Sequence, residues 1–285
     1  MCNKNKKAPF TLEDGYAYFG EFPCSLKAED VEVGSEACGR GYYLGSDGRY
    51  YAKVVACPKG EECIFSSGDR GISGETYYFL VEPIRWRVLA REAGRALLFS
   101  DRIIASMAYQ PSIHQRDGAF YISDEGALKD VFVNNYEHSS VRKWLNGDFL
   151  TAAFSADESE YILTTEVKNG PETLAVQSSD RFCCPDTLDK VFLLSFAESK
   201  SEELGFGDPQ ASVLATTDYA KATGAFSSMC EVGYGCGFWW LRSPDYNKSN
   251  FAMSATNSKT FARTMGLTHN TNIGVAPAVW VMTDD

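Results

Sequence analysis

The stretch from Gly237 to Met282 constrains the fold of this 285-residue chain more than any other part of it. Two anchors rich in large apolar residues bracket the stretch, FWWLRSP at 238–244 and GVAPAVWV at 274–281. Side chains of this size bury a large apolar area and fix the backbone around them. The residues between the anchors, 245–273, are rich in Asn, Thr, Ser and Ala, with a few aromatic and basic side chains. Such a composition is typical of an adaptable contact surface, so the pattern favours binding over catalysis.

The overall composition is that of an acidic globular chain. Hydrophobic residues make up 44%, and the formal net charge is -11 with a pI of about 4.9. An acidic chain repels phosphate, so we expect no nucleic-acid partner. No apolar run reaches the roughly eighteen residues of a membrane-spanning helix, so we expect no membrane span. The N-terminus lacks the apolar core of a signal peptide, which indicates a cytoplasmic protein by default, or a surface- or phage-associated one if a leader has been removed.

Alternation and turn signals predict strands near the N-terminus. Small and aromatic residues alternate over 15–22, as in a strand with one buried face. A β-rich run over 76–81 predicts a second strand, which Pro83 interrupts. Apolar and basic residues alternate strictly over 84–88, and the EAG sequence at 92–94 predicts a hairpin turn after them.

The middle of the chain carries helix signals. Ser139 or Ser140 can cap a helix that Asn146-Gly147 ends. Residues 155–158 (SADE) have the form of a capping box, and residues 218–222 predict a further short helix. Because the helices follow one group of strands and precede another, the order predicts an α+β fold.

Nine cysteines, an odd number, are spread along the chain. A secreted disulfide scaffold favours an even number in a much smaller domain, so we expect reduced thiols. The alternative is a zinc site built from Cys24, Cys38, Cys57 and Cys63. Their spacing contains no C-x2-C pair, and we therefore expect no metal.

Signals of catalysis are weak throughout the sequence. His114, His138 and His269 stand far apart and outside the contexts of metal-binding histidines, and no nucleophile elbow, P-loop or dinucleotide fingerprint occurs. We therefore expect a non-catalytic protein without cofactors. Cys230 and Cys236 flank a Gly-rich loop before the Trp pair, and they keep a cysteine-dependent enzyme open as the alternative.

The two anchors, WWLRSP and GVAPAVW, resemble the signature of a bacterial domain family of unknown function that is frequent in gut Firmicutes. Further stretches resemble the family: YFG at 18–20, YYAKV at 50–54, PIRWRVL at 83–89, SVRKWLN at 140–146, DKVFLLS at 189–195 and DYAKATG at 218–224. The resemblance extends from about Tyr16 onward. The family is similar to proteins with a C-type-lectin-type fold, of the kind shared with formylglycine-generating enzymes. Some members resemble the variable proteins of diversity-generating retroelements.

In such variable proteins, adenine-directed mutagenesis rewrites a C-terminal segment that the fold displays for binding. Rewriting an AAC or AAT codon gives neither Lys nor Met, so the fixed positions here would be Lys248, Met253, Lys259 and Met265. No cysteine follows the Trp motif, and the only Glu-Pro is Glu82-Pro83. The resemblance therefore implies neither the activity of formylglycine-generating enzymes nor calcium-dependent sugar binding. A carbohydrate-binding lectin-like module stays an alternative.

The resemblance implies one C-type-lectin-like domain over 11–285, and the N-terminal residues 1–10 are expected to form a disordered tail before it. The domain would be built on a twisted antiparallel sheet with the central helices against it, and residues 23–75 would form an inserted subdomain or long loops. The strand near Tyr16–Phe19 would lie close to the strand Ala278–Met282, which brings the termini together.

The sequence thus predicts a face between Asp245 and Ile273 for a protein or cell-surface ligand. The residues expected to contact the ligand are Tyr246, Asn247, Asn250, Thr256, Asn257, Phe261, Arg263, Leu267, His269, Asn270 and Asn272. We expect their side chains to be exposed together on one side of the molecule. The scaffold that holds them would comprise Trp239, Trp240, Arg242, Pro277 and Trp280. Among these, Arg242 is expected to be a buried or half-buried hydrogen-bond hub, because a guanidinium can satisfy several loop carbonyls.

Overall fold

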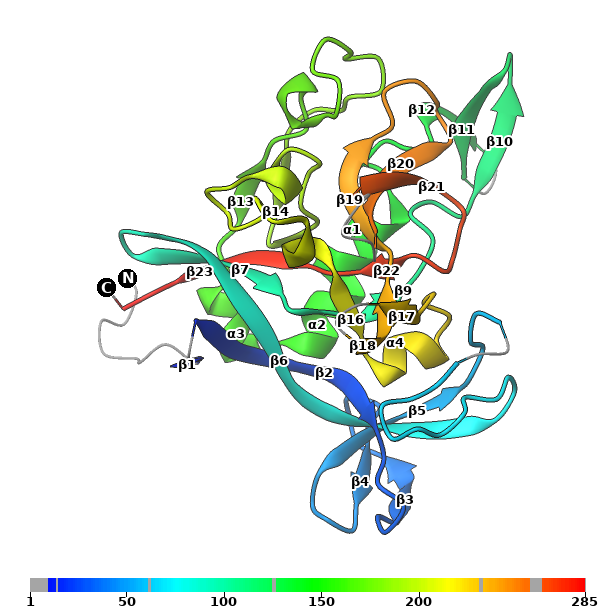
Figure 1. Ribbon diagram of the computed structural model, residues 1–285, viewed down its shortest axis with the longest axis vertical. Helices are drawn as coiled ribbons and strands as arrows, with labels where there is room; N and C mark the ends of the chain where they lie inside the picture. The colour runs from blue at the N-terminus through cyan, green and yellow to red at the C-terminus, as the bar shows by residue number, and fades with distance from the viewer. Residues whose placement is uncertain are drawn as a thin grey trace.

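The computed structural model describes residues 10–13, 15–60, 63–124, 127–230, 233–256 and 263–284. It has the predicted α+β class: most strand pairs are antiparallel, and short helices lie between the N-terminal and C-terminal strands of the chain. Figure 1 shows the helices α1, α2 and α3 beside the large sheet that crosses the molecule.

The largest sheet in the described residues has nine strands, in the order β15-β23-β7-β6-β5-β4-β3, with β2 also paired to β6 and β1 to β2. The strand bounds are β1 Thr11–Glu13, β2 Tyr16–Leu26, β3 Val33–Ala37, β4 Tyr43–Gly45, β5 Tyr50–Val55, β6 Thr76–Glu92, β7 Arg95–Ser100, β15 Val191–Phe192 and β23 Ala278–Met282. The long strand β6 organises this sheet, because its first part pairs with β5 and its last part with β7.

Pro83 does not interrupt β6, so that expectation is wrong. The residues of β6 that pair with β5 end at Leu80, and those that pair with β7 begin at Trp86. Pro83 lies in the gap between them, where no ladder bond with β5 or β7 needs its missing N–H. The predicted alternation holds over 84–86, since Ile84 and Trp86 are buried while Arg85 is half-buried, but Arg87 and Val88 are both half-buried.

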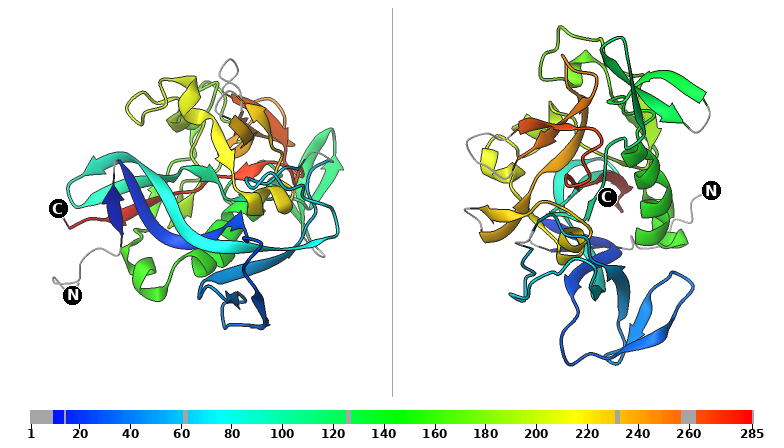
Figure 2. Two further views of the ribbon diagram at one scale, coloured as in Figure 1. Left: turned by 60° about the horizontal axis from the view of Figure 1, so that its bottom comes forward. Right: turned by 90° about the vertical axis from the view of Figure 1, so that its right-hand side faces the viewer.

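Strands β2 and β23 belong to the same sheet, although they do not pair. Tyr16 of β2 pairs with Arg87 of β6, Arg87 pairs with Phe99 of β7, and Phe99 pairs with Ala278 of β23. Strands β6 and β7 therefore lie between β2 and β23. Figure 1 shows the start of β2 and the end of β23 on the same side of the molecule, and the left view of Figure 2 agrees.

The helices are α1 Ser140–Trp144, α2 Leu150–Ala153, α3 Ala156–Tyr161 and α4 Asp218–Ala222. Ser139 caps α1, and the predicted capping box of Ser155 and Glu158 starts α3. The expected stop at Asn146-Gly147 is wrong, because a π-helical turn over Leu145–Phe149 connects α1 to α2. Within the described residues, no helix has the length and apolar character that crossing a membrane requires.

Smaller sheets complete the architecture. A five-stranded sheet has the order β21-β20-β19-β22-β9, a four-stranded sheet β17-β18-β16-β8, a three-stranded sheet β10-β11-β12 and a two-stranded sheet β13-β14. Their bounds are β8 Arg102–Ile103, β9 Ala105–Ser106, β10 Ile113–Arg116, β11 Ala119–Asp124, β12 Ala127–Phe132, β13 Thr165–Val167, β14 Thr187–Asp189, β16 Leu214–Thr216, β17 Ser228–Cys230, β18 Gly233–Gly237, β19 Trp239–Pro244, β20 Phe251–Ala255, β21 Arg263–Leu267 and β22 Gly274–Val275.

Residues 23–75 are partly regular, since β3, β4 and β5 extend the largest sheet. A second, small core joins this segment to β6 and α4, because Phe65 packs with Phe79 of β6 and with buried Ala222 of α4. The right view of Figure 2 shows β3 and β4 projecting away from the helices. Of the expected N-terminal tail, residues 1–9 lie outside the described residues, and Phe10 packs against the Phe19 ring.

Candidate ligand-binding face

The first C-terminal anchor forms β19, and both of its tryptophans are fully buried. Trp239 Nε1 donates to the carbonyl of Ser212 at 3.0 Å, and Trp240 Nε1 donates to the carbonyl of Met107 at 2.9 Å. Neighbouring strand residues point to opposite faces, so β19 must be covered on both sides. Neither indole is therefore available as a platform for a sugar.

Arg242, at 2% exposure, is a buried hub of hydrogen bonds. Its Nε donates to the carbonyl of Lys168 at 3.0 Å and its Nη1 to the carbonyl of Leu193 at 2.8 Å. Both terminal nitrogens reach the Glu198 carboxylate, and the Tyr109 hydroxyl donates to the Arg242 carbonyl at 2.9 Å. The guanidinium thus joins β19 to two other segments of the chain.

In the second anchor, Pro277 is buried and Trp280 is half-buried. The Arg95 guanidinium lies over the Trp280 indole, with its Cζ 4.5 Å from the ring centroid. The carbonyl of Pro277 accepts from Ser100 N at 2.9 Å, and that of Trp280 accepts from Leu163 N at 2.8 Å. These bonds fix the anchor between β7 and the residues after α3.

Between the anchors, the β20–β21 hairpin has an inner and an outer face. A Cβ added to Gly266 would lie 2.8 Å from the Trp240 ring, so the indole of Trp240, from the adjoining strand β19 of the same sheet, covers this side of the hairpin. In register, Phe251 lies opposite Leu267, and Met265 is two residues before Leu267, so the three side chains share the outer face. Met265 is 40% exposed, and the other two are half-buried.

The predicted contact residues fall into different environments. The exposed ones are Tyr246, Asn247 and His269, and the half-buried ones are Asn250, Leu267, Asn270 and Asn272. Thr256 is only 5% exposed, so the expectation of a displayed side chain there is wrong. It directly follows Ala255 at the fully buried end of β20, where neighbouring elements cover the strand. Asn257, Phe261 and the side chain of Arg263 lie outside the described residues.

A small aromatic sheet beside the hairpin was not predicted. On β10, β11 and β12 the half-buried rings of His114, Tyr121 and Phe132 stack in sequence, with centroids 5.7 and 5.1 Å apart. The Phe120 amide donates to Ser249 Oγ at 2.9 Å, which ties this sheet to the turn before β20. The sheet therefore adds aromatic surface next to the predicted face.

A dipeptide signal could have predicted this sheet. Asp117-Gly118 joins β10 to β11 with φ values of 50° and 76°. Asp-Gly with both residues at positive φ is typical of a type I′ hairpin turn.

The described cysteines do not assemble a metal site. Cys24, Cys38, Cys57 and Cys63 are free, and no group of three or more His, Cys, Asp or Glu side chains in the described ranges is placed to hold a metal ion. Cys236 is disulfide-bonded, so the expectation of reduced thiols is wrong for this residue. As a nucleophile it would first need that disulfide to be reduced. The side chain of Cys230 lies outside the described residues.

The free thiols should differ widely in reactivity. Burial raises the pKa of Cys24 and of Cys183 to about 11, whereas Cys38 and Cys57 are exposed. Since only the thiolate reacts, iodoacetamide at neutral pH should modify Cys38 and Cys57 first and leave Cys24 and Cys183 largely unmodified. Peptide mass spectrometry over a time course measures each rate. Modification of Cys24 as fast as that of Cys38 would instead indicate an activated thiol.

The comparisons with known proteins give one match. The model of a family described as a domain of unknown function (DUF6273) matches residues 93–283, from the β6–β7 turn through β23. The match does not reach the resembling stretches at 18–20, 50–54 and 83–89. No curated protein and no solved structure matches the chain. Over the part that contains both C-terminal anchors, and over more than half of its length, the chain belongs to this family of domains of unknown function.

Proposed function

We propose that the protein is a non-catalytic binding protein for a protein or cell-surface ligand. Its ligand face would be the outer face of the β20–β21 hairpin together with the turn before β20. The observation that carries the proposal is the exposure of two large apolar side chains here, Tyr246 at 43% and Met265 at 40%. Contiguous exposed apolar groups mark interaction sites, and we infer that these two side chains belong to one such surface.

The chemistry around these two side chains supports a protein ligand. Phe251 and Leu267 add half-buried apolar surface, and Lys248 Nζ lies 5.0 Å from the Phe251 ring centroid. A mixture of aromatic, apolar, amide and basic groups is typical of protein-binding surfaces. Asn270 has a local role, because its Oδ1 accepts from Asn272 N at 2.9 Å and shapes the turn after β21.

The rigid support beneath the face fits a surface that tolerates variation. Trp239, Trp240 and Arg242 are buried on the adjoining strand β19, so the exposed side chain of Met265 can change without loss of these core contacts. We infer from this and from the motif resemblance a C-type-lectin-type domain whose C-terminal segment is diversified. Neighbouring DNA tests the inference: it should encode a reverse transcriptase and contain a near-copy of the segment for residues 237–281. Absence of both would contradict diversification and leave the binding proposal standing.

Removing the exposed apolar groups should weaken binding strongly without unfolding the protein. We expect the double variant Tyr246→Ser with Met265→Ser to bind a protein ligand on the order of 30-fold more weakly, as loss of a central contact does. The change in unfolding free energy should stay within about 0.5 kcal/mol for each exposed position. Domains selected from a yeast-displayed library against the wild-type chain provide the ligands, and biolayer interferometry measures affinity.

The matched control is Val55→Ser with Leu188→Ser, which removes apolar groups that are 64% and 69% exposed elsewhere on the surface. The control should leave the affinities unchanged. Equal losses in both double variants would contradict a specific face. A glycan array gives the other arm, because binding to glycans in place of proteins would favour the carbohydrate-binding alternative.

A further inference from the structure

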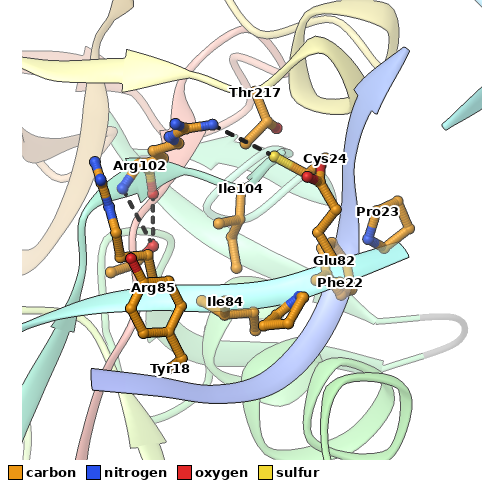
Figure 3. Close-up of a pocket in the computed structure, with 12 residues that line it drawn as sticks. Tyr18, Phe22, Pro23, Cys24, Glu82, Ile84, Arg85, Arg102, Ile104 and Thr217 are labelled. Carbon is orange, nitrogen blue, oxygen red and sulfur yellow. Dashed lines mark hydrogen bonds between the residues drawn. The ribbon is translucent and has the colours of Figure 1, made fainter. Parts of the chain in front are cut away.

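A hollow of about 210 Å³ lies where β2 bends away from its pairing with β6. The β2–β6 register shifts between Tyr18 and Glu21 and again between Pro23 and Leu26. Bulges of this kind bend a strand and often lie next to functional sites. Figure 3 shows the hollow, with β2 and β6 crossing it and Thr217, the residue that caps α4, at its rim.

Two charged side chains line the hollow without an ionic partner. Arg102 is exposed, and its Nη1 lies 3.6 Å from Cys24 Sγ. The Glu82 carboxylate accepts a hydrogen bond from Ser25 N at 3.0 Å. In the described part of the chain, neither Arg102 nor Glu82 forms an ion pair. The hollow therefore offers one free positive and one free negative group.

The other charged or nucleophilic groups in the hollow are already neutral or paired. Arg85 Nε donates to Asp101 Oδ2 at 2.9 Å, so this cation is compensated. Burial, reinforced by the nearby Glu82 carboxylate, raises the pKa of Cys24 to about 11, so the thiol carries no charge at neutral pH. Among the side chains that line the hollow, Arg102 and Glu82 are therefore the charged groups that form no ion pair within the described residues.

The floor of the hollow is apolar. Phe22, Ile84 and Ile104 line it and are each less than 10% exposed. Figure 3 shows Ile84 and Ile104 below the Arg102 and Cys24 side chains. The volume is smaller than the roughly 300 Å³ at which pockets for drug-sized molecules begin, so the occupant must be a small molecule.

We propose that this hollow binds a small zwitterion of the α-amino-acid type with an apolar side chain. Its carboxylate would bind Arg102, its ammonium group would bind Glu82, and its side chain would cover Ile84 and Ile104. A simple carboxylate would leave Glu82 unpaired beside it, and a simple amine would leave Arg102 unpaired. A molecule with both charges satisfies both groups and leaves the net charge of the hollow unchanged.

Calorimetric titration of the full chain tests the proposal with L-leucine and L-phenylalanine. The single-charge analogues of leucine are 4-methylpentanoate, which lacks the ammonium group, and 3-methylbutylamine, which lacks the carboxylate. We expect at least one amino acid to bind and its analogues to bind at least about tenfold more weakly, as loss of a charged hydrogen bond implies. Failure of both amino acids to bind with a Kd below about 10 mM would overturn the proposal.

Two variants separate a binding role from a structural one. Glu82→Gln should weaken the binding of leucine about tenfold or more but should leave the binding of 4-methylpentanoate unchanged, because only the ammonium contact is lost. Arg102→Gln should weaken the binding of leucine and of 4-methylpentanoate alike. Arg95→Gln, on β7 and away from the hollow, is the control and should change neither affinity. Leucine affinity that survives Arg102→Gln, or equal weakening of both ligands by Glu82→Gln, would overturn the assignment.

A readout without any variant comes from Cys24, whose side chain lines the hollow. Bound amino acid should slow its alkylation at alkaline pH and leave the rates of Cys38 and Cys57 unchanged. An unprotected Cys24 at saturating leucine would place the ligand elsewhere. The double variant Tyr246→Ser with Met265→Ser should bind leucine normally, so this site and the proposed protein-binding face can fail independently.

Discussion

Replacing Arg242 with alanine should lower the free energy of unfolding by about 3–5 kcal/mol, the range for breaking one side of a buried ion pair. The guanidinium is 2% exposed and donates to the carbonyls of Lys168 and Leu193 as well as to Glu198. Its removal leaves two carbonyls without their donor and the carboxylate without its cation. Urea denaturation followed by tryptophan fluorescence measures the change. A variant that melts like the wild type but has lost ligand binding would refute the structural role.

The matched control is Arg49→Ala. Arg49 forms an ion pair with Asp47 but is 57% exposed, so the change should cost far less stability than Arg242→Ala. A comparable loss in both variants would show that burial does not set the contribution of Arg242.

The same ion pair should make stability depend on pH. Burial alone would raise the pKa of Glu198, but attraction to Arg242 and hydrogen bonds from Arg242 and Ser195 outweigh it and lower the pKa below 4.5. A carboxyl group whose pKa is lower in the folded state stabilises the protein above its unfolded pKa, and this contribution is lost as pH falls through the folded pKa. The loss of unfolding free energy caused by Glu198→Gln should therefore be smaller below about pH 4.5 than at neutral pH.

Sequence signals that act within a single turn of the chain predicted their helices and hairpins correctly. The capping box at Ser155 and Glu158 starts a helix because it satisfies backbone groups within the same turn. The turn at Ala93-Gly94 joins β6 to β7, and Gly94 has the positive φ of 74° that the turn requires. Such features depend on few neighbours, so the sequence alone suffices to predict them.

Sequence signals gave wrong predictions where contacts between residues far apart in the chain determine the local structure. Asn146 ends no helix, because its Oδ1 accepts from the backbone N–H of Lys190 at 2.9 Å and its Nδ2 donates to the carbonyl of Val191 at 2.8 Å. These bonds hold the helix against β15 and outweigh the weak helix preference of Asn-Gly. The composition of 245–273 likewise predicted a contact segment but not the side chains that neighbours cover, such as Thr256. The Arg102–Glu82 hollow depends on a register shift between two strands, which no local pattern encodes.

Replacing Asp218 with alanine should also destabilise the protein by about 3–5 kcal/mol. Asp218 is 3% exposed and forms an ion pair with the equally buried Lys221 at 3.0 Å. It also accepts from Leu26 N at 3.2 Å and from Ser66 N at 2.8 Å. The change leaves a buried ammonium group without its anion and two backbone N–H groups without their acceptor. Urea denaturation gives the magnitude, with Glu21→Ala, half of an exposed ion pair, as the small-effect control.

The double variant Asp218→Ala with Lys221→Met shows which part of the loss comes from charge. Removing both charges should restore some stability, because a buried ion pair is often no better than apolar groups of similar volume. It should not restore all of it, because Leu26 and Ser66 would still lack an acceptor. Those two residues precede the family match at residue 93, whereas Asp218 lies within it. Hydrogen exchange at the Leu26 and Ser66 amides should therefore stay faster in the double variant than in the wild type. Full recovery of stability and of slow exchange would show that Asp218 acts only as the counter-ion of Lys221 and does not hold the N-terminal strands to the family domain.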